Sequence, residues 1–97
     1  MDEYSWPDER LVGRARAAWA ATIESLPVGT SITGKVIGRQ RFGVFVRIDG
    51  VPDALGLVEV TALPCGTSLP AVGDAVVGEV LWHAAHNHQI RIRPSQR

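Results

Sequence analysis

One short stretch of the sequence places an aromatic ring beside a guanidinium group. In the run 44–48 every second residue is a valine or isoleucine, which leaves Phe45 and Arg47 together on the opposite side. Burial in a core gives no reason for a ring on that outer side. The run 90–93 alternates in the same way and turns Arg91 outward. Because arginine offers a planar fork for phosphate and a face for stacking, these residues predict a surface with cations beside a π-face.

The histidines form a second group that could do chemistry. His83, His86 and His88 are all the histidines of the chain and fall within six positions, which raises the question of a metal site. Zinc sites in single hairpins usually recruit cysteine or a carboxylate as well. We therefore interpret this stretch as the polar tip of a hairpin, and we expect no metal and no cofactor.

The sequence holds no pattern typical of catalysis. It lacks paired carboxylates at a recognisable spacing, a glycine-rich phosphate loop before a helix and a Gly-x-Ser-x-Gly nucleophile. We expect no catalytic residues, and a binding module rather than an enzyme.

The charges of the chain are balanced. Ten Lys and Arg against ten Asp and Glu give a formal net charge of zero over 97 residues, so the broad positive field of a strong nucleic-acid binder is missing. The acidic start, Met1–Glu3, is unlike a secretory signal, and no apolar run approaches the roughly 18 residues of a membrane span. We interpret the single cysteine, Cys65, as an incidental small residue. We expect a cytoplasmic protein without membrane contacts.

The spacing of apolar residues changes at Pro27, which divides the elements that must position these side chains. Before it, apolar residues recur at spacings of three and four, the stripe of an amphipathic helix from Trp6 to Leu26. Ser5 is the predicted N-cap of this helix, and Pro7 fits its first turn. The stripe consists of Leu11, Ala15, Ala18, Trp19, Ile23 and Leu26. It is too large to leave in water, so we expect it to dock on the rest of the protein or to mediate dimerisation.

After Pro27 the apolar period is two. Five short runs separated by turn residues are predicted strands, at 32–38, 44–48, 57–60, 76–82 and 90–93. This layout predicts a mainly β protein, a small five-stranded closed barrel with an α-helix before it. The inward members form the predicted core: Ile32, Val36, Val44, Val46, Ile48, Val58, Val60, Val76, Val80, Ile90 and Ile92. The predicted organisation is a helix over 1–26 and a barrel over 27–97.

Four fragments of the barrel sequence resemble a known family. They run from Val28 to Val36, from Arg41 to Val46, from Leu55 to Thr61 and from Val72 to Val80. In this order and spacing they are similar to the S1 RNA-binding domain, an OB-fold family, over about residues 27–94. The helix before Pro27 lies outside this resemblance.

The resemblance implies a site on the outer face of the barrel. In that family, aromatic residues at the positions of Phe42 and Phe45 stack on bases, and basic residues around the first turn and the last hairpin meet phosphates. Stacking on exposed rings tolerates any base and suits unpaired strands. The implied partner is single-stranded RNA or single-stranded DNA. The implied contacts are Phe42, Phe45, Lys35, Arg39, Arg41, Arg47, Arg91 and His83.

Two departures from the family predict weak binding. Glu59 stands where the family usually has histidine, and a carboxylate there repels phosphate. The last hairpin is rich in histidine, which is mostly uncharged near neutral pH, where the family has an aspartate and basic residues.

A protein-interaction module is the rival interpretation, because OB barrels serve many functions. Trp6, Trp19 and Trp82 are a large aromatic content for so small a chain. If the helix packed over the outer face it would bury Phe45 and cover the nucleic-acid site, whereas packing on an end or edge would leave the site open. The sequence leaves both arrangements open.

Overall fold

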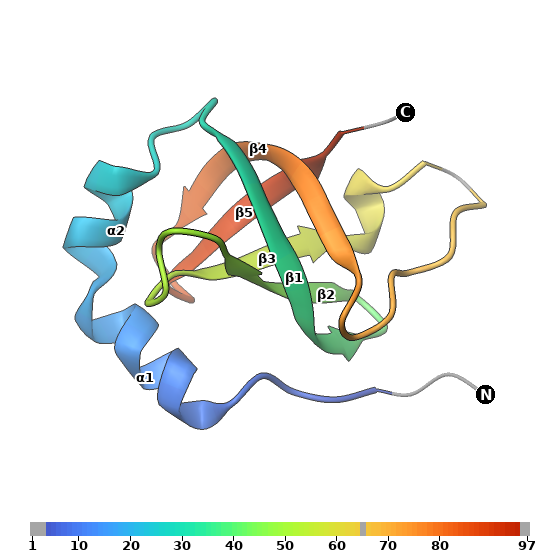
Figure 1. Cartoon of the computed structure of the whole chain (residues 1–97), viewed down its shortest axis with the longest axis horizontal. Helices are drawn as coiled ribbons and strands as arrows, with labels where there is room; N and C mark the ends of the chain where they lie inside the picture. The colour runs from blue at the N-terminus through green and yellow to red at the C-terminus, as the bar shows by residue number, and fades with distance from the viewer. Residues whose placement is uncertain (1–3, 65, 96–97) are drawn as a thin grey trace.

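The computed structural model describes residues 4–64 and 66–95 and has five strands closed into a barrel (Figure 1). The strands are β1 (Ser31–Gln40), β2 (Gly43–Ile48), β3 (Leu55–Glu59), β4 (Ala75–Ala84) and β5 (Gln89–Pro94). They follow the order β1-β2-β3-β5-β4, and β4 pairs back to β1. The pairings are antiparallel apart from that of β3 with β5. The predicted five-stranded OB-type barrel is confirmed, and the inferences drawn on Met1–Glu3 and Cys65 lie outside the described residues.

The core inside the barrel consists of the inward members of the alternating runs. Every predicted core residue except Val60 is buried in one cluster, together with Ala54 and with Leu26 from the end of the helical segment. Val60 was predicted wrongly and is 42% exposed, because the chain leaves β3 at Glu59 and turns through the 3-10 helix η1 (Val60–Ala62). The period-two pattern thus identified the core wherever the strand continued.

Two bulges interrupt the alternation. The pairing of β1 with β2 shifts between Val36 and Gly38, and that of β4 with β5 shifts between Val80 and Trp82. A bulge adds one residue to a strand and so reverses the face of the side chains beyond it. In β4 this turns Trp82, which is in phase with the inward Val80, to the outside, where it is 46% exposed.

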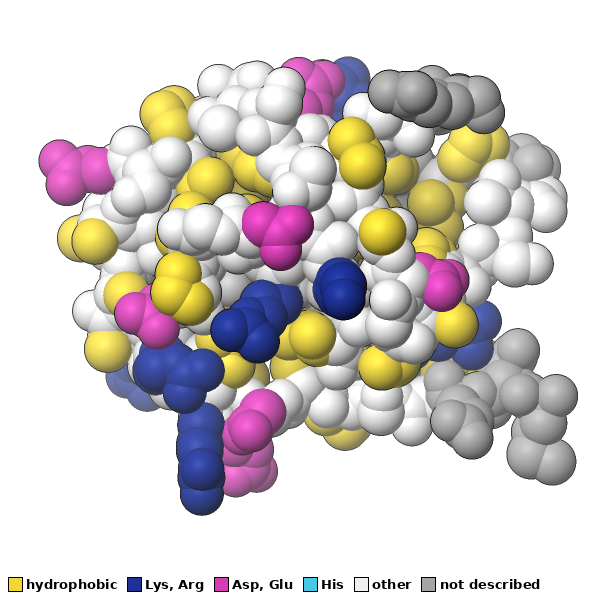
Figure 2. All heavy atoms as spheres, viewed as in Figure 1, with side chains coloured by type: hydrophobic (Ala, Val, Ile, Leu, Met, Phe, Trp, Pro, Cys, Tyr) yellow, Lys and Arg dark blue, Asp and Glu magenta, His cyan; other side chains and the backbone are white. Residues whose placement is uncertain are grey.

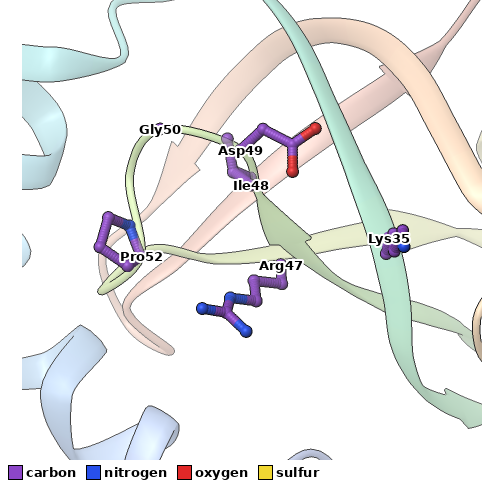
Figure 3. Close-up of a pocket in the computed structure, with 6 residues that line it drawn as sticks. All are labelled: Lys35, Arg47, Ile48, Asp49, Gly50 and Pro52. Atoms are coloured by element: carbon purple, nitrogen blue, oxygen red, sulfur yellow. The ribbon is translucent and has the colours of Figure 1, made fainter.

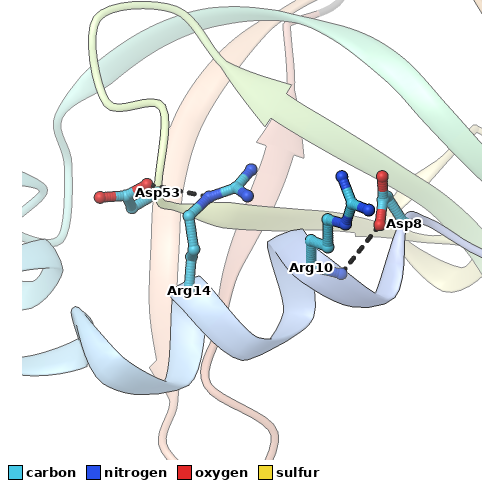
Figure 4. Close-up of polar contacts among 4 residues, drawn as sticks. All are labelled: Asp8, Arg10, Arg14 and Asp53. Carbon is cyan, nitrogen blue, oxygen red and sulfur yellow. Dashed lines mark hydrogen bonds and ion pairs between the residues drawn. The ribbon is translucent and has the colours of Figure 1, made fainter.

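The helical segment differs from its prediction. It forms two helices, α1 (Glu9–Ala17) and α2 (Trp19–Ser25), where one helix from Trp6 to Leu26 was expected. The N-cap is Asp8, whose carboxylate accepts a hydrogen bond of 2.8 Å from the backbone N–H of Arg10 (Figure 4). Ser5 cannot cap the helix because proline disfavours helical conformation in the residue before it, and here that residue is Trp6. Neither helix of the described chain is long and apolar enough to cross a membrane.

The two helices pack on two different parts of the barrel, which explains the break between them. Leu11 and Ala15 of α1 pack on the outer face of the sheet, whereas Trp19 of α2 packs against the barrel core together with Leu26. The break at Ala18 lets one stripe reach both surfaces. An ion pair of 3.2 Å between Arg14 and Asp53 joins α1 to the loop between β2 and β3 (Figure 4). Docking of the predicted stripe is therefore confirmed.

Docking of α1 predicts unequal effects at two adjacent helix positions. Leu11→Ala should lower the free energy of unfolding by about 2–5 kcal/mol, because Leu11 is buried against the sheet. Val12→Ala, the matched control at an exposed position, should change it by less than about 1 kcal/mol. Urea denaturation followed by circular dichroism measures both. Equal effects would contradict the docking.

Candidate nucleic-acid interface

A row of side chains crosses the outer face of the barrel over four strands. Phe45 of β2 pairs with Leu57 of β3, Leu57 with Arg91 of β5, and Arg91 with Trp82 of β4. Residues paired on neighbouring strands point to the same side of a sheet. The outward placement of Phe45 and Arg91 predicted from alternation is therefore confirmed, and both belong to one continuous surface.

Phe45 points outward but is not exposed. Its side chain is only 3% accessible and lies in a second hydrophobic cluster with Leu11 and Ala15 of α1 and Leu55 and Leu57 of β3. The prediction that Phe45 offers a free ring to a base is wrong, because the apolar stripe of α1 covers it. Of the two arrangements left open by the sequence, the structure has the helix over Phe45.

The segment before α1 extends the sheet beside β1. The N–H of Ser5 donates to the carbonyl of Arg39 over 2.7 Å, and the N–H of Arg39 donates to the carbonyl of Ser5 over 2.8 Å. Pro7 is buried against Gly38, where an added Cβ would lie 3.0 Å from the proline nitrogen. The absence of a side chain at Gly38 therefore allows this close approach, which holds Trp6 over the sheet.

Three exposed rings gather where this segment meets the turn between β1 and β2. Tyr4, Trp6 and Phe42, which we call the aromatic cluster, are 43%, 67% and 45% exposed. The Trp6 ring lies 6.0 Å from Phe42 and 5.9 Å from Phe45, measured between ring centroids. Of these three rings, Phe42 was predicted from the sequence, whereas Trp6 was assigned to a helix and Tyr4 was not identified. The proline after Trp6 was the signal for an extended segment.

Two of the predicted cations lie at the aromatic cluster. The guanidinium of Arg39 lies 5.6 Å from the centre of the Tyr4 ring, and that of Arg41 lies 5.8 Å from it. Both distances are within the range of a cation–π interaction. Arg41 is exposed, while Arg39 is half-buried and also donates to the carbonyl of Leu69 over 3.5 Å. The structure thus brings Arg39 and Arg41 together with the exposed rings.

Lys35 and Arg47 lie farther along the same hairpin. They pair with each other across β1 and β2, and Lys35 is five residues from the strand end at Gln40, which corresponds to about 16 Å. They line a separate hollow of about 270 Å³ with Asp49 of the following loop (Figure 3). The structure therefore does not place these two cations at the aromatic cluster.

Arg91 is held by two partners on the outer face. Its Nη1 donates to Oε1 of Glu59 over 2.8 Å, and its guanidinium lies 5.0 Å from the centre of the Trp82 ring. The Arg91 side chain is 14% exposed and that of Glu59 is 40% exposed. Glu59 thus neutralises Arg91 on this surface.

His83 has a structural position. Its Nε2 lies 2.6 Å from the carbonyl oxygen of Leu26, and because a carbonyl only accepts, Nε2 carries the proton. The half-buried ring also meets Trp19 edge to face, with ring centroids 6.3 Å apart. This contact fastens the end of α2 to β4, and the nucleic-acid contact expected of His83 stays a prediction. Residues 4–64 and 66–95 contain no group of three or more His, Cys, Asp or Glu placed to hold a metal ion.

Charges of both signs are mixed over the surface. On the face shown in Figure 2, Lys and Arg side chains alternate with Asp and Glu side chains. Besides the pair at Glu59, Arg14 pairs with Asp53 and Arg93 pairs with Glu79 over 3.1 Å. Such mixing leaves little long-range field, as the net charge of zero predicts.

Solved structures of other proteins share this fold. GSP13 from Bacillus subtilis is 32% identical with a TM-score of 0.57, over 69% of this chain and 54% of its own length, so the chain spans about half of that relative. A multidomain protein with nucleic acid binding domains from Streptococcus pneumoniae is 14% identical with a TM-score of 0.61, over 72% of this chain and 23% of that chain. Mycoplasma genitalium RNase R in complex with ribose-methylated single-stranded RNA is 13% identical with a TM-score of 0.69, over 84% of this chain and 15% of that chain. No family model and no curated protein matches the chain.

The structural position of His83 predicts a loss of stability on its removal. His83→Ala should lower the free energy of unfolding by about 1–2 kcal/mol, because the carbonyl of Leu26 loses its donor. His86→Ala is the matched control, since His86 is exposed and should leave the stability unchanged. Thermal denaturation of both variants decides the matter, and equal melting temperatures would contradict the assigned role.

Proposed function

We propose that this S1-type OB-fold domain is a non-catalytic module that binds single-stranded RNA weakly, through the aromatic cluster and the arginines beside it. The observation that carries the proposal is the pair of exposed rings, Trp6 and Phe42, held 6.0 Å apart on the barrel surface. A base stacked on such a ring contributes about 1–3 kcal/mol, whatever its identity. Rings left in water by a small folded chain are suited to that use.

The position of the cations supports contact with the sugar-phosphate backbone. Arg39 and Arg41 hold their guanidinium groups at the edge of the aromatic cluster, over Tyr4. A strand whose bases stack on Trp6 and Phe42 would carry its phosphates past these groups. Because Arg39 and Arg41 are the two arginines at the cluster within the described residues and Arg91 is paired with Glu59, the electrostatic contribution is small and the binding weak.

The shape of the surface favours unpaired strands over duplexes. Stacking on Trp6 and Phe42, which are both exposed, requires bases that are free to leave a partner strand. The similarity to RNase R, solved with single-stranded RNA, supports RNA as the partner. Single-stranded DNA, which offers the same bases and phosphates, is the second ligand to test.

The proposal predicts saturable binding of single strands that depends on the two rings. A labelled oligoribonucleotide of about ten residues should bind at low salt, and its duplex should bind more weakly. Trp6→Ala and Phe42→Ala should each lower the affinity about tenfold without changing the salt dependence. Trp6→Phe keeps a ring and should retain most of the affinity. Fluorescence anisotropy at several salt concentrations measures these values.

Two further variants separate stacking from charge. Arg41→Ala should lower the affinity and also reduce the slope of log affinity against log salt by about 0.7, the contribution of one phosphate on a single strand. Val77→Ala, at an exposed apolar position on β4, should change neither quantity. Failure of single strands to bind at low salt, or ring variants that bind like the parent, would rule the proposal out.

The pairing of Glu59 with Arg91 gives an independent prediction. Glu59→Gln should tighten RNA binding and steepen the salt slope by about 0.7, because it frees Arg91 for a phosphate and removes a repulsive charge. Glu79→Gln is the matched control, as it breaks the comparable ion pair with Arg93. An equal gain in both variants would show a general effect of net charge and would count against a local role of Glu59.

A protein-interaction module is the second candidate function. The burial of Phe45 under α1 and the neutralised Arg91 favour it, because both reduce the surface that the S1 family resemblance implies for nucleic acid. The aromatic cluster would then receive apolar side chains of a partner protein. The absence of any oligonucleotide binding at low salt would favour this function over the first.

A further inference from the structure

A groove opens beside the aromatic cluster, on the other side of Trp6. It has a volume of about 370 Å³ and is lined by residues of the N-terminal segment, α1, β2, β3 and the hairpin between β4 and β5. The residues that line it include Trp6, Glu9, Val12, Phe45, Leu55, Asn87 and Gln89. Because Trp6 belongs to both, the groove is continuous with the surface proposed to bind RNA.

The floor and walls of the groove suit a flat apolar ring. Phe45 and Leu55 are 3% and 2% exposed and form its bottom, while Trp6 and Val12 are 67% and 44% exposed and stand at its sides. Phe45, which α1 covers, thus forms the floor of this groove. Trp6 and Val12 come from the N-terminal part of the chain, outside the region that resembles the S1 family.

The polar part of the lining carries no cation. It consists of the amides of Asn87 and Gln89 and the carboxylate of Glu9, and no Lys or Arg of the described residues lines the groove. Oε1 of Gln89 is buried and has no hydrogen-bond partner within the described chain. A phosphate would meet the carboxylate of Glu9, so the groove is unsuited to the backbone of a nucleic acid. A group that donates N–H bonds at its edge fits both the carboxylate and the amide oxygens.

We propose that this groove receives one unpaired base with an exocyclic amino group, such as adenine or cytosine, and gives the domain a preference against uracil. The inference rests on the proposed binding of single-stranded RNA. The ring of the base lies between Trp6 and Val12 above Phe45, and its amino edge donates to Glu9 and, after the Gln89 side chain turns toward the base, to the amide oxygen of Gln89. Carboxylate and amide oxygens accept from such amino groups in base recognition, whereas uracil has a carbonyl oxygen, O4, where cytosine and adenine carry the amino group.

Titrations with homopolymers test the preference. Oligo(A) and oligo(C) of about ten residues should bind the full chain about tenfold more tightly than oligo(U) of the same length, the effect of one or two hydrogen bonds to a base edge. Gln89→Leu should reduce this ratio to less than about twofold. The variant should melt like the parent, because the Gln89 side-chain oxygen has no partner to lose. Gln40→Leu is the matched control, since Gln40 does not line the groove, and should keep the ratio.

Filling the groove tests its occupancy by a second route. Val12→Phe should lower the affinity for oligo(A) about tenfold, to the level of oligo(U), because the added ring takes the place of the base. Ala17→Phe adds the same ring at an exposed position of α1 away from the groove and should leave the affinity unchanged.

The outcomes separate this inference from the function on which it rests. If all homopolymers bind the parent equally, or if Gln40→Leu abolishes the preference as fully as Gln89→Leu, the groove does not hold the base, while the aromatic cluster remains the binding surface. If Val12→Phe and Ala17→Phe both bind like the parent, the inference is likewise overturned. If no homopolymer binds, both proposals fall together, and an interaction with a protein takes their place.

Discussion

The packing of α1 on Phe45 determines what the outer face of the barrel can do. Leu11 and Ala15 cover the ring and join it to Leu55 and Leu57, so that a surface typical of ligand binding becomes a second hydrophobic cluster. Burial of a phenylalanine side chain stabilises the fold by about 1.5–3 kcal/mol, which is comparable to the contribution of one stacked base. Once the helix is present, Phe45 serves the stability of the protein, and the proposed stacking surface depends on other rings.

That other ring comes from the same segment that buries Phe45. The chain reaches α1 through an extended stretch that pairs with β1 at Arg39, and this stretch carries Tyr4 and Trp6 to the turn that holds Phe42. Covering one ring and adding two others are thus consequences of a single docking arrangement. The same arrangement forms one wall of the groove above Phe45. The aromatic cluster and the groove therefore both depend on the position of one helix.

Electrostatics limit the strength of any nucleic-acid contact on this surface. Three arginines near the outer row contact another group: Arg91 contacts Glu59 and Trp82, and Arg39 and Arg41 contact Tyr4. An arginine held over a ring keeps its charge and its orientation, whereas one paired with a carboxylate is compensated. Specificity on such a surface comes from shape and hydrogen bonding to bases more than from the field of the protein.

Local sequence patterns determined the barrel, its core and the outward direction of Phe45 and Arg91, because the face of a strand residue follows from its parity alone. The S1 resemblance predicted the OB fold and the position of Phe42 for the same reason, because turn residues and the spacing of strands are local features of the sequence. The bulge that exposes Trp82, the end of β3 that exposes Val60 and the burial of Phe45 were decided only by the tertiary structure. Each of these features depends on which distant element packs against the residue, and the spacing of residues within one strand does not predict that element. The exposed state of a side chain is a property of its neighbours in space, and for this domain those neighbours come from a helix that precedes the barrel in the chain.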